Sequence, residues 1–418
     1  MAKKKKILTI SDHPLFSTGV AIQTRLFIES MLQTDKYDFI SLAGAVRHAD
    51  TSPIRTEQYG DRWKIFPIEG YGNEEVVRSV IRTERPDILW LMTDPRYWTW
   101  LWNIEDEIRA QVPMVYYHVW DNEPAPLYNR KFYDSNDVVV SASKLTERLV
   151  EEVGTTAEHV RIPHTFDPAV FKKLPTEEVQ AFKSEYFGDL PEGKKIFFWN
   201  NRNTLRKNPT TMLWWFKEFL SEVGEDKACL LVHTDPNEPT GTNLEENLSV
   251  LGLNNGQVMI SPLKYPPDKM AMLYNVADCT INISDAEGFG LSTLESLACG
   301  TPIIASNTGG LAEQVTDGEQ EFGVKIEPST RTVIGSHKVP YIYQDRISKE
   351  DFISALKKIV DMPDSEREEL GMNGMKHAYS QYNLDSFAEK WGFVIDNVIN
   401  NRGSWGTRKH KGWEVIEL

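Results

Sequence analysis

Cysteine is scarce in this chain of 418 residues, which contains Cys229, Cys279 and Cys299 and no other cysteine. Three thiols cannot pair completely, and each of them lies in or beside an apolar run. We therefore expect buried thiols in a reducing compartment rather than a disulfide framework or a cysteine-based metal cage.

Long apolar runs and an excess of positive charge are also missing. No segment approaches the roughly 18 to 20 apolar residues that a membrane-spanning helix needs, and the apolar run near the start is too short for a signal sequence. The 46 Lys and Arg residues against 61 Asp and Glu residues give a net charge of −15. A bulk attraction to nucleic acid or to an anionic membrane is therefore not expected. These absences predict a cytoplasmic protein without a transmembrane segment, while peripheral membrane contact stays open.

The composition is that of a globular protein, with 40% hydrophobic and 26% charged residues, which excludes a disordered chain. Short apolar strand patterns alternate with helical patterns along the chain, and this alternation is typical of parallel sheets covered by helices. The alternation pauses over residues 167–194, which are rich in Pro, Glu and Lys, and then begins again. We therefore predict an α/β fold with two Rossmann-like domains facing across a cleft.

The predicted domains cover residues 1–170 and 171–385. Residues 386–418 are expected to form a C-terminal helix and tail, with a return to the first domain as one option. Residues 329–346 interrupt the pattern of the second domain without a clear period, so we treat them as an insertion of unassigned role.

One segment carries most of the chemical information. Residues 284–300 read SDAEGFGLSTLESLACG, in which a predicted strand end is followed by Glu287, by Gly288-Phe289-Gly290 and by a helix that contains Glu295. Glycines let backbone amides approach a ligand closely, and a helix start offers unpaired N–H groups and the positive end of a dipole. This combination suits a phosphate or a diphosphate.

Two carboxylates beside a phosphate site must face groups that donate hydrogen bonds, such as the hydroxyls of a ribose or a hexose. The segment therefore predicts a site for a sugar phosphate or a sugar nucleotide. The alternative is that Glu287 caps a turn and Glu295 is a solvated helix residue. The order of strand end, acid, paired glycines, helix start and second acid favours the functional interpretation.

The same residues resemble the E-x7-E signature of retaining GT-B glycosyltransferases in its family 4 form. The likeness continues through residues 301–310, Glu313, 317–318 and 322–324. The resemblance implies that Glu287 contacts the transferred sugar and Glu295 the donor ribose. It also implies that a run of neighbouring residues binds the sugar and phosphate groups of the donor: Gly288, Phe289, Gly290, Leu291 and Ser292.

A second element is the basic loop after the predicted strand 195–199, which contains Arg202, Arg206 and Lys207. Cations at a strand end can clamp an anion, although a solvated basic loop is the ordinary alternative. The resemblance implies that Arg202 and Lys207 bind the donor diphosphate. Asn201 stands where the family usually has glycine, and Arg206 could share the role.

The first domain offers fewer signals. Gly19 opens the first predicted helix, where family members have a glycine-rich loop that contacts donor phosphate or acceptor. His118 ends the predicted strand 113–118, and the resemblance implies that it faces the transferred sugar; a structural histidine is the alternative. Trp98, Trp100 and Asp121 are the acceptor-site candidates, with core packing as the competing explanation for the two tryptophans.

The resemblance implies a retaining, metal-independent glycosyltransferase that moves a sugar from a nucleotide-diphosphate sugar, most simply of the UDP type, to a hydroxyl acceptor. Neither a tightly bound cofactor nor a metal site is expected. Two alternatives remain open. The first is a phage-type enzyme that glycosylates hydroxymethylated pyrimidines in DNA, which the aromatic stretch 97–102 and the basic tail 402–411 would suit. The second is a non-catalytic nucleotide-sugar sensor.

Overall fold

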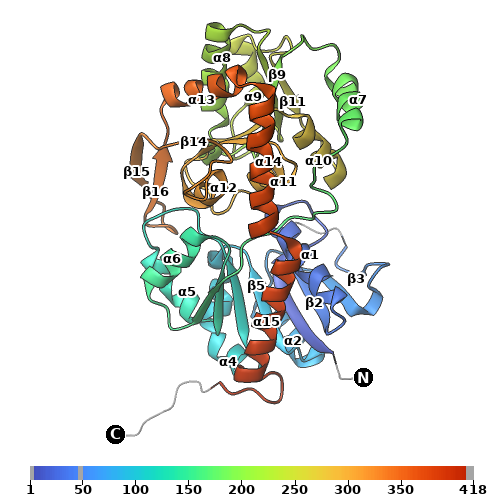
Figure 1. The fold of residues 1–418 in the computed structure, drawn as a ribbon. Coiled ribbons are helices and arrows are strands. Elements are labelled where there is room, and N and C mark those ends of the chain that lie inside the picture. The colour runs from blue at the N-terminus through green and yellow to red at the C-terminus, as the bar shows by residue number, and fades with distance from the viewer. Residues whose placement is uncertain (1–3, 46–49, 411–418) are drawn as a thin grey trace. The chain divides into compact units, whose positions relative to one another are not determined.

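The structure is a computed structural model that describes residues 4–45 and 50–410. The chain divides into two compact units. Unit 1 comprises residues 1–165, 336–340 and 384–418, and unit 2 comprises residues 166–335 and 341–383. Each unit is built on a sheet of mostly parallel strands with helices packed against it, as the alternating pattern predicts (Figure 1).

Unit 1 contains an eight-stranded sheet in the order β3-β4-β2-β1-β5-β6-β7-β8. β3 pairs antiparallel with β4, and the other neighbours are parallel. From β1 the chain adds strands on one side and then crosses to β5 on the other, so the strand order reverses between β1 and β5. The strands are β1 (Lys5–Asp12), β2 (Tyr37–Gly44), β3 (Ile54–Arg55), β4 (Trp63–Pro67), β5 (Ile88–Met92), β6 (Met114–His118), β7 (Val138–Ser141) and β8 (Glu158–Arg161).

Helices of unit 1 lie on both faces of this sheet. The last one, α15, belongs to unit 1 although it follows the residues of unit 2 in the sequence. Its apolar side chains recur at helical spacing, and Trp391 packs 4.8 Å from the Phe27 ring and 5.8 Å from the Trp90 ring. The helices are α1 (Gly19–Gln33), α2 (Glu74–Glu84), α3 (Thr99–Asn103), α4 (Glu105–Arg109), α5 (Arg130–Asp134), α6 (Lys144–Val153) and α15 (Leu384–Arg402).

The segment after α15 is anchored to unit 1 as far as it is described. The side chain of Arg408 is only 4% exposed and forms an ion pair with Asp137 at 2.6 Å, and its Nε donates to the carbonyl of Arg109. The guanidinium of Arg408 is therefore held by unit 1 and is not solvated. Residues 411–418 lie outside the described part of the chain.

Unit 2 contains a six-stranded parallel sheet in the order β11-β10-β9-β12-β13-β14. The strand order reverses between β9 and β12, because β10 and β11 extend the sheet on one side of β9 and β12 begins the other side. The strands are β9 (Lys195–Asn200), β10 (Ala228–His233), β11 (Val258–Ser261), β12 (Cys279–Asn282), β13 (Ile303–Ser306) and β14 (Gly323–Ile326).

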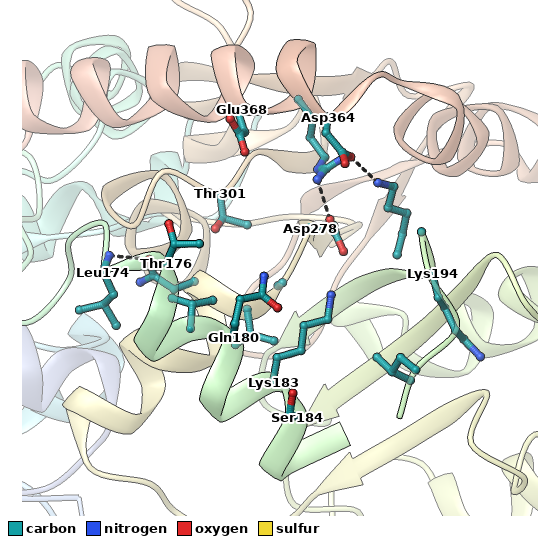
Figure 2. A pocket seen from close by; sticks show the side chains of 18 of the residues that line it. Leu174, Thr176, Gln180, Lys183, Ser184, Lys194, Asp278, Thr301, Asp364 and Glu368 are labelled. Atoms are coloured by element: carbon teal, nitrogen blue, oxygen red, sulfur yellow. Dashed lines mark hydrogen bonds and ion pairs between the residues drawn. The ribbon is translucent and has the colours of Figure 1, made fainter. Parts of the chain in front are cut away.

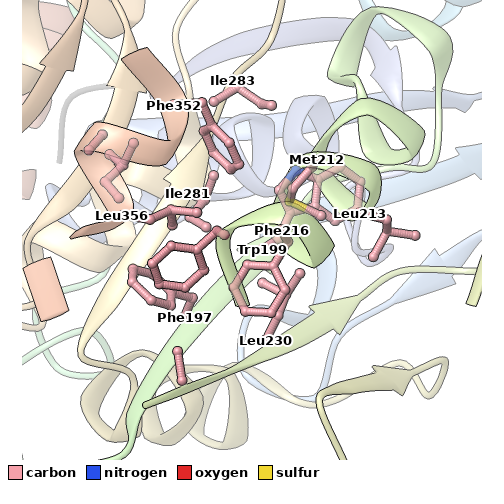
Figure 3. Packing of buried hydrophobic residues seen from close by; sticks show 14 of the residues in the cluster. Phe197, Trp199, Met212, Leu213, Phe216, Leu230, Ile281, Ile283, Phe352 and Leu356 are labelled. Atoms are coloured by element: carbon pink, nitrogen blue, oxygen red, sulfur yellow. The ribbon is translucent and has the colours of Figure 1, made fainter. Parts of the chain in front are cut away.

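One face of this sheet packs on α8 (Pro209–Val223), α9 (Leu244–Leu251) and α13 (Lys349–Asp361). Figure 3 shows that core, in which Phe197 and Trp199 of β9 lie among Phe216 of α8 and Phe352 of α13. The other face packs on α10 (Pro267–Val276), α11 (Leu291–Ala298) and α14 (Asp364–Gln381). Two further helices of unit 2 are α7 (Thr176–Phe187) and α12 (Ala312–Val315).

The segment treated as an insertion forms a two-stranded antiparallel hairpin of β15 (Thr330–Ile334) and β16 (Ile342–Arg346). The three cysteines are buried free thiols, as predicted. Among the residues that the structure describes, no helix is both long and apolar enough to span a membrane.

Candidate functional site

The candidate site of unit 2 is built where the strand order of the sheet reverses. β9 and β12 are neighbours in the sheet, and both are followed by loops at the carboxyl edge, over residues 201–208 and 283–290. In open α/β sheets, ligands bind at this edge and at this reversal. The predicted basic loop and the predicted acidic loop therefore lie on neighbouring strands.

The glycine loop before α11 is held tightly in place. Gly290 has φ = 94°, and a Cβ built on Gly310 would lie 2.5 Å from the Cα of Phe289, so neither position accommodates a larger residue without a shift. The N–H of Gly310 donates to the carbonyl of Glu287 at 2.8 Å, and the Gln314 amide donates to the carbonyl of Phe289 at 2.7 Å. The loop is thus fixed directly before the first-turn amides of α11, beginning at Leu291, which have no intrahelical partner.

Opposite charges meet at Glu287. Its carboxylate forms an ion pair with the ammonium of Lys207, and the Arg206 guanidinium lies 3.7 Å from the same oxygen. Glu287 and Lys207 are both buried, which makes each charge strongly dependent on the other. The structure therefore brings together Glu287, Lys207 and Arg206.

Arg202 lies elsewhere. Its guanidinium donates two hydrogen bonds of 2.9 Å to Glu238 in the loop after β10, and its side chain is 68% exposed. The hydrogen bond from Arg202 lowers the pKa of Glu238 to about 2. A role for Arg202 at the donor diphosphate stays a prediction, and Arg206 is the arginine that the structure places near Glu287.

Glu295 lies one turn into α11 and is connected to the end of β9. The Tyr274 hydroxyl donates to the Glu295 carboxylate at 2.8 Å, and the Asn200 amide donates to the Tyr274 oxygen at 2.7 Å. Burial raises the pKa of Glu295 to about 7, although the Tyr274 hydrogen bond opposes the shift. Asn200 and Tyr274 are not among the predicted site residues; the position of Asn200 directly after a predicted strand was the available signal.

The corresponding reversal in unit 1 lies between β1 and β5, and a polar cluster surrounds it. Thr18 caps α1 just before Gly19 and donates to Asp12 at 2.6 Å, and the Tyr71 hydroxyl donates to the other Asp12 oxygen at 2.7 Å. Thr93, at the end of β5, donates to Tyr71 at 3.2 Å. Asp12 was missed from the sequence because a lone acid after a strand is a common turn residue.

His118 is completely buried at the end of β6. Its Nδ1 lies 2.9 Å from the Tyr116 hydroxyl and its Nε2 lies 2.8 Å from the Tyr133 hydroxyl, so both ring nitrogens have protein partners. Burial lowers the pKa of His118 to about 3, which keeps the ring neutral. This arrangement is that of a structural histidine, and a contact with the transferred sugar stays a prediction.

The aromatic stretch predicted for acceptor stacking is mostly core. Trp98 is completely buried and packs edge-on against Tyr116 at 6.0 Å, so its face is not available for stacking in this structure. Trp100 and Asp121 are half-buried. The exposed ring of the stretch is Tyr97, which is 58% exposed and lies 4.9 Å from Tyr71.

A cavity of about 520 Å³ opens at the opposite, amino edge of the unit 2 sheet. Arg367 forms an ion pair with Asp278 at 2.9 Å, and Lys195 forms one with Asp364 at 2.6 Å. Figure 2 shows Asp278 and Asp364 among the side chains that line the cavity. Lys183 of α7 also lines it. The cavity is lined by residues at the amino ends of β9, β12 and β13, whereas the candidate site is built from the loops that follow β9 and β12. The cavity is therefore separate from the candidate site.

Comparisons with known proteins address the family directly. Residues 183–377 match the family model described as "Glycosyl transferases group 1". A D-inositol 3-phosphate glycosyltransferase of Acidothermus cellulolyticus is 30% identical over 207 residues, which are 46% of this chain and 45% of that protein. The chain therefore spans less than half the length of that curated relative.

Solved structures match over nearly the whole chain. A sucrose-phosphate synthase from Thermosynechococcus elongatus has a TM-score of 0.75 at 17% identity, covering 95% of this chain and all of that one. HepE of Anabaena, crystallised with UDP and glucose, has a TM-score of 0.68 at 15% identity, covering 94% of this chain and all of that one. At these identities the likeness shows the fold. The chain thus has the GT-B fold, and its residues 183–377 match the group 1 glycosyltransferase model, in agreement with the resemblance of the Glu287–Glu295 segment to the family 4 form.

Proposed function

We propose that the protein is a retaining glycosyltransferase that moves a sugar from a nucleoside diphosphate sugar to a hydroxyl acceptor without a metal ion. The observation that carries the proposal is the meeting of Glu287, Lys207, Arg206 and the start of α11 at the strand reversal of unit 2. A carboxylate accepts hydrogen bonds from sugar hydroxyls, while the cations and the amides suit a diphosphate.

The chemistry follows from these charges. As the bond from the anomeric carbon to the donor phosphate oxygen breaks, negative charge builds on the diphosphate. Lys207, Arg206 and the α11 amides stabilise that charge, which is the part that a divalent metal plays in other enzymes. The acceptor oxygen then bonds to the anomeric carbon on the face that the diphosphate leaves, and the acceptor proton passes to the departing phosphate oxygen. Glu287 orients the sugar.

The donor is proposed to carry uridine, because HepE, which shares the fold, was crystallised with UDP. Glu295 would accept hydrogen bonds from the ribose hydroxyls. Its hydrogen bond from Tyr274 fixes one carboxylate oxygen and orients the group.

The acceptor is proposed to bind unit 1 at the reversal between β1 and β5, where Asp12 can accept a hydroxyl hydrogen bond and Tyr97 offers an exposed ring. Arg96 is held by Asp94 and lies over the Trp120 ring, so this arginine is already engaged within the protein. An uncharged polyol or sugar suits this set better than a nucleic acid. The DNA alternative relied in part on basic residues of the tail. Arg408 does not support it, because its guanidinium is already paired with Asp137.

The test is a transfer assay with nucleotide sugars, UDP-glucose first, and a panel of sugars, polyols, sugar phosphates and hydroxymethylcytosine DNA. We expect a product that keeps the anomeric configuration of the donor, read by NMR, in the presence of EDTA. Glu287→Ala and Lys207→Ala should each lower kcat/KM by about 100-fold or more. Lys349→Ala, which removes a half-exposed ion pair with Glu218, is the matched control.

Each part of the proposal can fail separately. Donor binding without transfer or hydrolysis across the panel would favour the sensor alternative. An inverted product would contradict retention, and loss of activity in EDTA that a divalent metal restores would contradict metal independence.

A further inference from the structure

The inserted hairpin β15–β16 combines an exposed strand with a buried acid. All five residues of β15 are exposed, and Val333 is 64% exposed. Asp345, near the end of β16, is only 2% exposed. Burial of a carboxylate is costly unless partners compensate it, so the contacts of Asp345 indicate what the hairpin is attached to.

The carboxylate of Asp345 joins the hairpin to the loop after β13. It accepts a hydrogen bond of 2.7 Å from the Thr308 hydroxyl and one of 2.6 Å from Nε of Arg331. Thr308 directly precedes Gly309 and Gly310, and Gly310 packs on the backbone of the 288–289 turn. The buried acid therefore supports the turn that packs against the glycine loop.

A second connection runs to the acidic loop itself. The N–H of Asp345 donates to the Asp285 carbonyl at 2.8 Å, and the Arg346 guanidinium lies 3.1 Å from the Asp285 carboxylate. Asp285 also accepts a hydrogen bond of 2.5 Å from the Asn208 amide, and its N–H donates to the Arg206 carbonyl at 2.8 Å. Asp285 thus connects the hairpin to the loop that contains the basic cluster, two residues before Glu287.

We propose that the hairpin over residues 330–346 is a positioning element for the donor site, in which Asp345 and Arg346 hold the Glu287 loop and the Thr308–Gly310 turn in their binding geometry. The inference rests on the proposed function, since it names what those loops are held for. Loops that follow parallel strands have no ladder of their own, so their geometry depends on contacts of this kind. Asp345 and Arg346 act through Glu287 and are positioning residues.

The first experiment needs no substrate. Hydrogen exchange of the 283–290 and 307–310 backbone is compared between wild type and the variants Asp345→Ala, Asp345→Asn and Arg346→Ala. We expect faster exchange in both segments, with β10 and β11 unchanged, and a partial return of protection in Arg346→Lys. Lys349→Ala is the control, because it removes a half-exposed ion pair on α13 that does not contact these loops.

The second experiment measures kinetics. Loss of the buried hydrogen bonds in Asp345→Ala should raise the donor KM about tenfold and leave the acceptor KM within about twofold. Arg346→Ala should raise the donor KM about threefold, because the pair is half exposed. If the variants lower the melting temperature but change neither loop exchange nor the ratio of the two KM values, the hairpin is only structural and the inference is overturned. Wild-type protein that binds no nucleotide sugar would overturn the proposed function instead. The hydrogen-exchange result would still show whether the hairpin holds the two loops in place.

Discussion

Donor binding should become tighter as the pH rises through 7, because of Glu295. Burial raises the pKa of this carboxyl to about 7, and only the ionised form accepts hydrogen bonds at both oxygens from ribose hydroxyls. With a pKa of about 7, about a tenth of the sites are ionised at pH 6 and about nine tenths at pH 8. The association constant should therefore rise about tenfold between pH 6 and pH 8, which corresponds to about 1.4 kcal/mol.

Glu295 also makes the free energy of unfolding depend on pH. Its ordinary pKa of 4.5 applies to the unfolded chain, and its pKa in the folded protein is raised to about 7. The folded protein therefore binds the proton more tightly. The stability that comes from this proton is present at low pH and is lost as the pH rises from about 4.5 through 7. Ligand-free protein should therefore lose stability as the pH rises to about 7, which overlaps the lower part of the range in which donor affinity increases.

The assay is isothermal titration calorimetry with a nucleotide sugar at pH 6, 7 and 8 and constant ionic strength. The diphosphate of a nucleotide sugar is fully ionised throughout this range, so the change belongs to the protein. The pKa of His118 and that of His164 are lowered to about 3 by burial, so neither histidine titrates there. Tyr274→Phe should move the midpoint to higher pH, because the Tyr274 hydrogen bond lowers the pKa of Glu295.

Glu295→Gln provides the decisive comparison. The amide keeps the shape of the side chain and does not titrate, so donor affinity should become independent of pH. Wild-type affinity that does not change between pH 6 and pH 8, or an unchanged slope in Glu295→Gln, would refute the assignment of Glu295 to the donor ribose.

Two further predictions concern the diphosphate cations and the core of unit 1. Arg206→Ala should lower donor affinity more than Arg202→Ala, because Arg206 lies near Glu287 whereas Arg202 is held by Glu238; equal losses by calorimetry would contradict this ranking. Trp391→Ala should lower the free energy of unfolding by about 3 to 5 kcal/mol, while Phe393→Ala on the same helix, at 73% exposure, should change it by less than about 0.5 kcal/mol. Urea unfolding measures both variants, and equal destabilisation would show that α15 does not support the core through its buried face.

The sequence predicts the features that depend on local order. Alternating apolar strands and helices indicate the two parallel sheets, and the spacing from Glu287 to Glu295 indicates the loop before α11. In both cases, the residues that form the feature are close together in the sequence as well as in the structure.

Contacts between residues that are far apart in the sequence could not be predicted from these local patterns. Whether Arg202 or Arg206 lies near Glu287 is decided by Glu238, some thirty residues further along the chain. The environment of His118 depends on the Tyr133 hydroxyl, which belongs to a different element. The attachment of the hairpin depends on a contact between Asp345 and Asp285 that no local pattern reveals.

The loop from Glu287 to Glu295 is proposed to bind a nucleotide sugar, and a crystal structure of the protein with UDP-glucose is the sharpest test of that proposal. We predict the diphosphate at Lys207 and the first amides of α11, the hexose hydroxyls at Glu287 and the ribose hydroxyls at Glu295. A nucleotide sugar bound away from this loop, with the ion pair of Glu287 and Lys207 undisturbed, would contradict the claim.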